Sequence, residues 1–151
     1  MAEGREQRDE GRQLFCRVIT PKEVIYDGEA DLVVARIADG DLGVLVDHSP
    51  LVSTVEVGEV RIREDEEQHV YATSDGFFKV SENLVQVLVE EAVSAEDIDI
   101  DAAENRVEEA ERDLSEVSEE AEDRDRVVAE IERRQRMGEN LVRVARKYGE
   151  S

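Results

Sequence analysis

The sequence has little of several residue types on which catalytic or cross-linked sites depend. Among 151 residues there are no tryptophan, one cysteine, two prolines, three phenylalanines and three tyrosines. A single cysteine, Cys16, cannot form a disulfide within the chain, which is typical of a protein from a reducing compartment. With so few aromatic side chains, a carboxylate pair would have no platform on which to bind a sugar.

Positive charge is also scarce. The chain carries 19 Lys and Arg against 40 Asp and Glu, which gives a formal net charge of −21. Such a surface repels phosphate backbones and anionic lipids, so we expect no nucleic-acid binding. No apolar run approaches the ~18 residues of a membrane-spanning helix, and the N-terminus lacks the apolar stretch of a signal peptide. We therefore expect no direct insertion into lipid.

Motifs for catalysis and cofactor binding are missing. The sequence contains neither a phosphate-binding P-loop nor a G-x-G-x-x-G turn. Cys16 lies inside a strand pattern, and the only imidazoles are those of His48 and His69, which are not at zinc-ligand spacing. The sequence predicts no catalytic residue, no metal site and no cofactor.

Short, Val-rich segments predict a β-sandwich domain over residues 14–93. LFCRVIT, DLVVARI, LVSTVEV, VRIRE, HVYAT and LVQVLVEEAV read as strands, and turn pairs such as Asp27-Gly28 and Asp75-Gly76 interrupt them at short intervals. Many short strands at this spacing are typical of a sandwich or barrel. Residues 1–13 are polar and without period, which predicts a disordered or extended tail.

The period changes at Ser94, and residues 94–151 are predicted to form a C-terminal helical domain in which residues 99–148 are helical. Apolar residues recur every three or four positions from Ala103 to Tyr148, with a break expected within 115–125. The same positions also form a degraded heptad seam. The sequence therefore permits both a two-helix hairpin and one long extended helix.

Charge is divided unevenly between the two predicted helices. Residues 104–123 contain ten acids and two arginines, whereas residues 133–147 contain six bases and one acid. The six bases are Arg133, Arg134, Arg136, Arg143, Arg146 and Lys147. Opposite charges favour the hairpin, and the basic segment is equally suited to an acidic partner.

One segment resembles a known signature. Residues 40–51, GDLGVLVDHSPL, are similar to the G-x-[LI]-G-[IV]-L-P-x-H-x-P-L motif of the epsilon subunit of F-type ATP synthases, which is called delta in mitochondria. VGEVRIR and SDGFFKVSENLVQVLVEEA resemble two further motifs of that family, in the same order. Val46 and Val57 stand where proline is usual. The similarity covers residues 14 to about 115 closely and extends to 148 by pattern.

This resemblance implies a β-sandwich followed by a helical hairpin, which the periodicity predicts independently. It implies a non-catalytic rotor subunit that contacts the gamma subunit and the c-ring, couples proton flow to ATP synthesis, and inhibits ATP hydrolysis by extending its helices toward the catalytic alpha and beta subunits. Such a subunit is peripheral at the cytoplasmic face of the cell membrane. Two alternatives remain: a stand-alone nucleotide-sensing module and an acidic coiled-coil adaptor.

The resemblance also assigns residues. Thr20, Asp41 and His48 match positions that contact gamma or the c-ring, and Arg133, Arg134, Arg136, Arg143, Arg146 and Lys147 match the inhibitory helix. Some family members bind ATP through I-D-x-x-R-A. Here Ile98, Asp99 and Ala103 are kept but Ala102 replaces the arginine, so we expect weak or absent ATP binding unless Arg106 substitutes for it.

Overall fold

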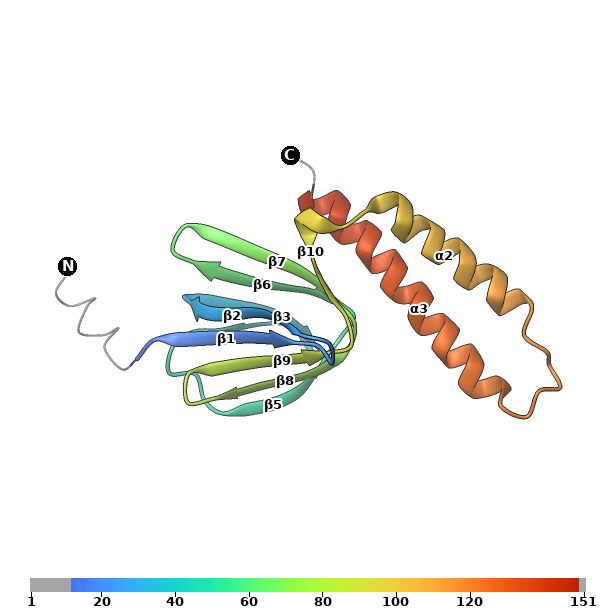
Figure 1. Ribbon diagram of the computed structural model, residues 1–151. Coiled ribbons are helices and arrows are strands. Elements are labelled where there is room, and N and C mark those ends of the chain that lie inside the picture. Colours follow the sequence, from blue (N-terminus) through green and yellow to red (C-terminus); the bar gives the residue numbers. More distant parts are fainter. Residues whose placement is uncertain (1–11, 150–151) are drawn as a thin grey trace. The chain divides into compact units, whose positions relative to one another are not determined.

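The computed structural model describes residues 12–149, and the chain divides into two compact units between Ala92 and Val93. Of the tail expected over residues 1–13, only Arg12 and Gln13 lie within the described residues. The predicted class, a β-sandwich followed by a helical hairpin, is confirmed (Figure 1).

The first sheet has the strand order β2-β1-β9-β8-β5. Its strands are β1 (Leu14–Ile19), β2 (Val24–Ala30), β5 (Leu51–Val55), β8 (Gly76–Ser81) and β9 (Leu84–Val89). All neighbours are antiparallel except β1 and β9, which run parallel with Phe15 opposite Leu84. The strand nearest the N-terminus therefore lies inside this sheet, between β2 and β9, one of the last strands.

The second sheet has the strand order β10-β7-β6-β3-β4. Its strands are β3 (Leu32–Ile37), β4 (Gly40–Val44), β6 (Gly58–Glu64), β7 (Glu67–Thr73) and β10 (Ala92–Ser94). Strand β4 is absent from the strands that alternation alone predicts, because Gly40 and Gly43 occupy two of its five positions and weaken the β signal.

The two sheets enclose an apolar core made largely of valine. Cys16, Val18, Val33, Ala35, Val60, Ile62, Phe78, Val85 and Val87 are fully buried. These side chains alternate with outward-facing ones, as the two-residue period of a strand requires. β-branched side chains suit such a thin core because they pack well on a pleated surface.

Turn chemistry fixes where the strands end. Glu82 and Asn83 connect β8 to β9 with φ values of 53° and 63°, and Asp65 begins the β6–β7 turn at φ 56°. Two central residues at positive φ match the right-handed twist of the flanking strands. Gly76 meets a packing requirement instead, because a Cβ there would lie 2.1 Å from the carbonyl oxygen of Leu88.

The second unit is a helical hairpin. A short 3₁₀ turn, η1 (Ala95–Asp97), precedes α2 (Ile100–Ser115) and α3 (Arg124–Val144), and the chain ends in a π-helical turn, η2 (Ala145–Gly149). Asp99 caps α2 by accepting a hydrogen bond from the backbone N–H of Ala102 at 3.1 Å. The break between the helices falls within the predicted segment 115–125.

The two helices pack through small and apolar side chains. Ala103 and Ala110 of α2 and Ile131, Met137, Gly138, Leu141 and Val144 of α3 are buried. Gly138 lets the helices approach closely, since a Cβ there would lie 2.8 Å from Val107 Cγ2. The structure therefore shows the hairpin, one of the two arrangements that the sequence permits.

Candidate functional site

The outer face of the first sheet exposes a row of side chains that crosses all five strands and is apolar on four of them. Strand register places Val24, Ile19, Leu88, Phe77 and Thr54 side by side. Val24, Leu88 and Phe77 are 54%, 43% and 61% exposed. Apolar side chains gathered at this exposure are typical of a docking surface rather than of a solvated sheet.

The remaining outward positions extend this surface. Arg17, Gln86, Lys79 and Val52 form a second row, and Phe15 lies opposite Leu84. On β1, β9, β8 and β5 no outward residue is a carboxylate, although the chain as a whole has a net charge of −21. We call the outward residues of these four strands the apolar face. The absence of Asp and Glu from these outward positions distinguishes the apolar face from the rest of a strongly acidic chain.

Thr20 and Asp41 lie at one end of the sandwich. Thr20 follows β1 and closes a turn in which its Oγ1 accepts from the Glu23 backbone N–H at 3.3 Å. Asp41 stands opposite Arg36, and its Oδ1 accepts from Arg36 Nε at 3.4 Å. Asp41 is the second residue of strand β4 and closely follows the β3–β4 turn.

His48 lies at the opposite end, because β4 carries the chain across the sandwich before its loop begins. This loop is tied to the β8–β9 turn: the Asp47 N–H donates to Asn83 Oδ1 at 2.6 Å. Hydrogen bonds from Arg12 and Asn83 lower the pKa of the Asp47 carboxyl. The structure thus places Thr20 and Asp41 at one end of the sandwich, on different sheets, and His48 at the other end.

The basic segment lies on the exposed side of α3 and η2. All six of its cations are exposed. Two of them join the helices: Arg134 Nη2 lies 2.9 Å from Asp113 Oδ2, and Arg146 Nη2 lies 2.9 Å from Glu104 Oε2. The expected attraction between an acidic first helix and a basic second helix therefore takes the form of ion pairs.

The residues of the degenerate ATP motif lie together. Ile98, Asp99, Ala102, Ala103 and Arg106 all line one shallow hollow of the helical unit, together with Val93, Asp97 and Leu141. Ala102 is exposed at its rim. Asp99 is already used as the cap of α2. The structure brings Arg106 to the same hollow as Ala102, one helical turn away.

Comparison with known proteins identifies the family. Residues 13–95 match the family described as ATP synthase, Delta/Epsilon chain, beta-sandwich domain. The chain belongs to this family. The ATP synthase epsilon chain of Rubrobacter xylanophilus is 65% identical over 93% of this chain and 97% of its own length. The sodium ion specific epsilon chain of Propionigenium modestum is 31% identical over 87% and 92%.

Solved structures share the fold. A chain of the Euglena gracilis mitochondrial ATP synthase, solved with OSCP, F1 and the c-ring, matches with a TM-score of 0.68 and 23% identity over 86% of this chain and 79% of its own. A chain of the Tetrahymena thermophila central stalk and c-ring matches with a TM-score of 0.57, 12% identity and coverage of 91% and 96%. Family membership rules out an acidic adaptor unrelated to ATP synthase.

The sequence prediction missed the apolar face. In the sequence, this face is indicated by pairs of adjacent apolar residues within one strand, such as Phe77-Phe78 and Leu88-Val89. A strand with one solvated face alternates apolar and polar residues, so an apolar pair of this kind indicates that both faces are covered. In the first sheet one face packs on the core and the other faces outward.

Proposed function

We propose that this chain is the rotor subunit that links gamma to the c-ring and couples proton flow to rotary ATP synthesis without performing bond chemistry itself. Membership in the epsilon family and the fold shared with central-stalk chains support this role. Thr20, Asp41 and His48 are the contact positions that the family resemblance assigns.

The apolar face is the observation that carries the proposal. A row of exposed apolar side chains, flanked by Lys79 and free of carboxylates, suits a partner that is apolar with an acidic group at its margin. The other neighbouring cation, Arg17, pairs with Asp27 of β2 at 3.3 Å. We assign this face to gamma. Asp41 lies at the end of the sandwich shared with Thr20, where a carboxylate can meet a cationic group on the polar loops of the c-ring.

The helical unit supplies the regulatory part of the proposal. Arg134 and Arg146 pair with α2 acids in exposed positions, where an ion pair contributes at most about 1 kcal/mol. Replacing Asp113 and Glu104 as partners by acids on the catalytic alpha and beta subunits therefore costs little free energy. We propose that the helices separate, extend toward those subunits and block ATP hydrolysis.

The same proposal places the chain at the cytoplasmic face of the cell membrane, as a peripheral part of the complex. Across residues 12–149, no helix has both the length and the apolarity needed to span a bilayer. Attachment through gamma and the c-ring is enough to hold the subunit there.

The docking role is tested by binding full-length variants to the cognate catalytic complex that contains gamma but lacks this subunit. Phe77→Ser is expected to weaken binding at least about tenfold, because truncating a central apolar anchor typically costs over 1 kcal/mol. Leu45→Ser changes a side chain exposed to a similar degree, 59% against 61%, but outside the apolar face. If Leu45→Ser weakens binding and Phe77→Ser does not, gamma docks through the His48 loop instead.

Inhibition is tested in the same complex by ATP hydrolysis. The full chain and a version ending at Ser94, which keeps β10, are each titrated into the depleted complex. The proposal expects both to bind and only the full chain to suppress hydrolysis. If both bind and neither suppresses hydrolysis, the inhibitory role is wrong while the rotor role stands.

A second candidate role, nucleotide sensing, has one supporting observation: all five motif residues line one hollow. Ala102 removes the cation that would meet the phosphates, so we expect ATP binding to be weak. Because Ala102 is exposed, Ala102→Arg fits without repacking and should tighten binding. A calorimetric titration of both forms with ATP tests this, and tight binding by the unchanged chain would show that Arg106 supplies the missing charge.

A further inference from the structure

The end of the β6–β7 hairpin concentrates negative charge. Glu64, Asp65, Glu66 and Glu67 follow one another, and the register places Glu64 directly opposite Glu67. Like charges that face each other across two strands destabilise the pair. The hairpin therefore holds two carboxylates close together, where a cation would offset their repulsion.

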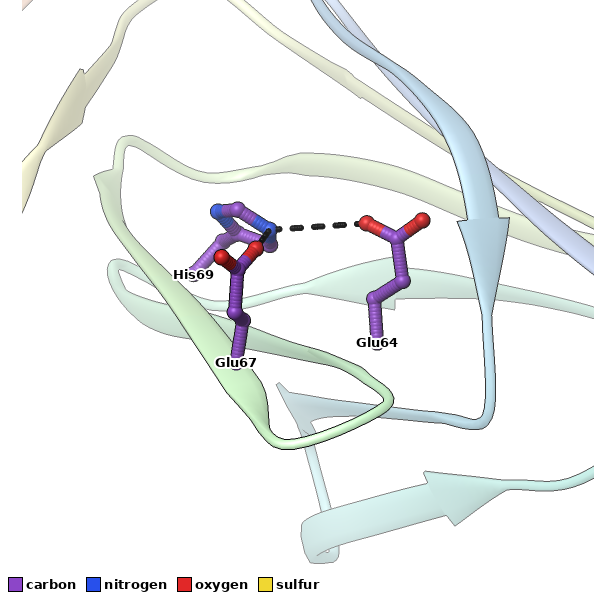
Figure 2. Close-up of side chains that lie close together, drawn as sticks. All are labelled: Glu64, Glu67 and His69. Atoms are coloured by element: carbon purple, nitrogen blue, oxygen red, sulfur yellow. Dashed lines mark ion pairs between the residues drawn. The ribbon is translucent and has the colours of Figure 1, made fainter.

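His69 lies between these carboxylates. Its Nε2 is 3.7 Å from Glu64 Oε1 and 3.8 Å from Glu67 Oε1, and the three ligand atoms all lie within 4.8 Å of one another (Figure 2). Nε2 is shielded from solvent yet makes no hydrogen bond. A buried polar atom of this kind usually has a hydrogen-bond partner or an ion. Figure 2 shows the imidazole and both carboxylates pointing toward one shared space.

The surrounding residues hold the three side chains in place. His69 is on the same face of β7 as Tyr71, which belongs to the core. The ring of Tyr26, from β2, lies 5.2 Å from the His69 ring. Its hydroxyl donates to the Glu29 carbonyl oxygen at 3.0 Å and also lies 3.4 Å from Glu64 Oε1. The cluster is thus built on a packed hairpin, with the Tyr26 ring beside the imidazole.

We propose that Glu64, Glu67 and His69 bind one divalent first-row transition-metal ion such as Zn²⁺. Imidazole favours zinc and its neighbours, whereas Mg²⁺ and Ca²⁺ prefer oxygen alone. Tetrahedral ligands with bonds of about 2.1 Å lie about 3.4 Å apart, close to the observed 3.7 and 3.8 Å. The side chain of Glu67 is exposed and that of Glu64 is 41% exposed, so side-chain rotations can complete the site, and water fills the remaining position.

Bound metal would neutralise the charge at the hairpin end and join β6 to β7. Because an ion that binds only the folded chain stabilises it by mass action, the sandwich should become more stable as free metal rises. This site is independent of the apolar face and of the helices, and it does not depend on the proposed rotor function.

The test is a calorimetric titration of the untagged full-length chain with Zn²⁺, with excess Mg²⁺ present to occupy weak carboxylate sites. One equivalent should bind. His69→Ala and the near-isosteric Glu64→Gln should each weaken binding at least about tenfold. His48→Ala removes the other histidine and should leave binding unchanged.

Imidazole signals in NMR spectra give a second readout, since the chain has two histidines. Zn²⁺ should shift the ring signals of His69 and leave those of His48 in place. The same spectra show whether the tested chain is folded. The proposal is overturned if the chain binds no Zn²⁺, if His69→Ala and Glu64→Gln bind as tightly as the unchanged chain, or if only the His48 signals respond.

Discussion

Gly138 of α3 lies so close to Val107 of α2 that a Cβ on the glycine would sit 2.8 Å from Val107 Cγ2, and 3.4 Å from the Ala103 carbonyl oxygen. The hairpin therefore depends on the absence of a side chain at one position. In an isolated helix, alanine would be favoured over glycine by about 1 kcal/mol. Packing therefore favours glycine at position 138, whereas helix propensity favours alanine.

Gly138→Ala is expected to destabilise the hairpin by about 1–3 kcal/mol, because overpacking outweighs the propensity gain. Urea unfolding of the full chain, followed by circular dichroism at 222 nm, measures this. Glu139→Ala changes the next, exposed residue and should shift stability by less than about 0.5 kcal/mol. A more stable Gly138→Ala variant would mean that the helices do not pack this closely in solution.

Arg134→Gln should change hairpin stability by less than about 1 kcal/mol, since Arg134 and Asp113 are 44% and 45% exposed. In the reconstituted complex it should weaken inhibition of ATP hydrolysis severalfold. The matched control is Arg126→Gln, which removes ion pairs to Asp123 and Glu130 within the helical unit but lies outside the basic segment. Equal effects of the two variants on hydrolysis would contradict a role specific to the basic segment.

Asp99→Ala should destabilise the helical unit by about 1 kcal/mol, because the Ala102 N–H loses its acceptor at the start of α2. Asp99→Asn keeps an acceptor oxygen and should retain most of this stability. Thermal unfolding of both variants measures the difference. Equal losses in the two would show that the negative charge near the helix start matters more than the hydrogen bond.

Stability should fall at alkaline pH because of Cys16. Burial, followed by the charge of Asp27, raises the Cys16 pKa from 9.0 to about 12. Between these values the unfolded chain has lost the thiol proton while the folded chain keeps it, so the free energy of unfolding decreases as pH rises, by about 1.4 kcal/mol per pH unit. Urea unfolding from pH 8 to 10.5 tests this.

Cys16→Ala isolates that contribution. The variant will be less stable overall because it leaves a cavity, but its stability should vary less steeply with pH above 9. Identical slopes for the variant and the unchanged chain would mean that the thiol can ionise in the folded state. A thiol reagent at pH 8 should likewise react with Cys16 only after unfolding.

Much of the fold can be predicted from the sequence because the structural preference of each segment agrees with the position that the segment takes in the fold. The helix break at 115–125 has only a weak signal in the sequence, namely Ser115, Ser118 and a run of acids whose like charges repel. Strands β1, β3, β5, β6, β7 and β9 follow from alternation, whereas β2, β4 and β8 are not among the strands that it predicts. In β4, Gly40 and Gly43 remove side chains that would show the pattern, and pairing with β3 holds the segment in the sheet.

The sites are harder to predict, because they depend on register and strand direction. The resemblance assigns Thr20, Asp41 and His48 to contacts with gamma or the c-ring, and only the direction of the strands shows that His48 lies at the other end of the sandwich. The cluster of Glu64, Glu67 and His69 depends on a two-residue turn that sets the carboxylates opposite each other. The ring of Tyr26, which packs against His69, comes from the other sheet. No local sequence pattern predicts this contact.

The parallel pairing of β1 with β9 also has a consequence for biosynthesis. Phe15 cannot meet Leu84 until the ribosome has added the residues between them, which takes on the order of ten seconds at 5–20 residues per second. During that time one side of β1 has no strand to pair with, and its open edge can bind other chains. The first sheet of this chain therefore cannot be completed during synthesis until its ninth strand has emerged.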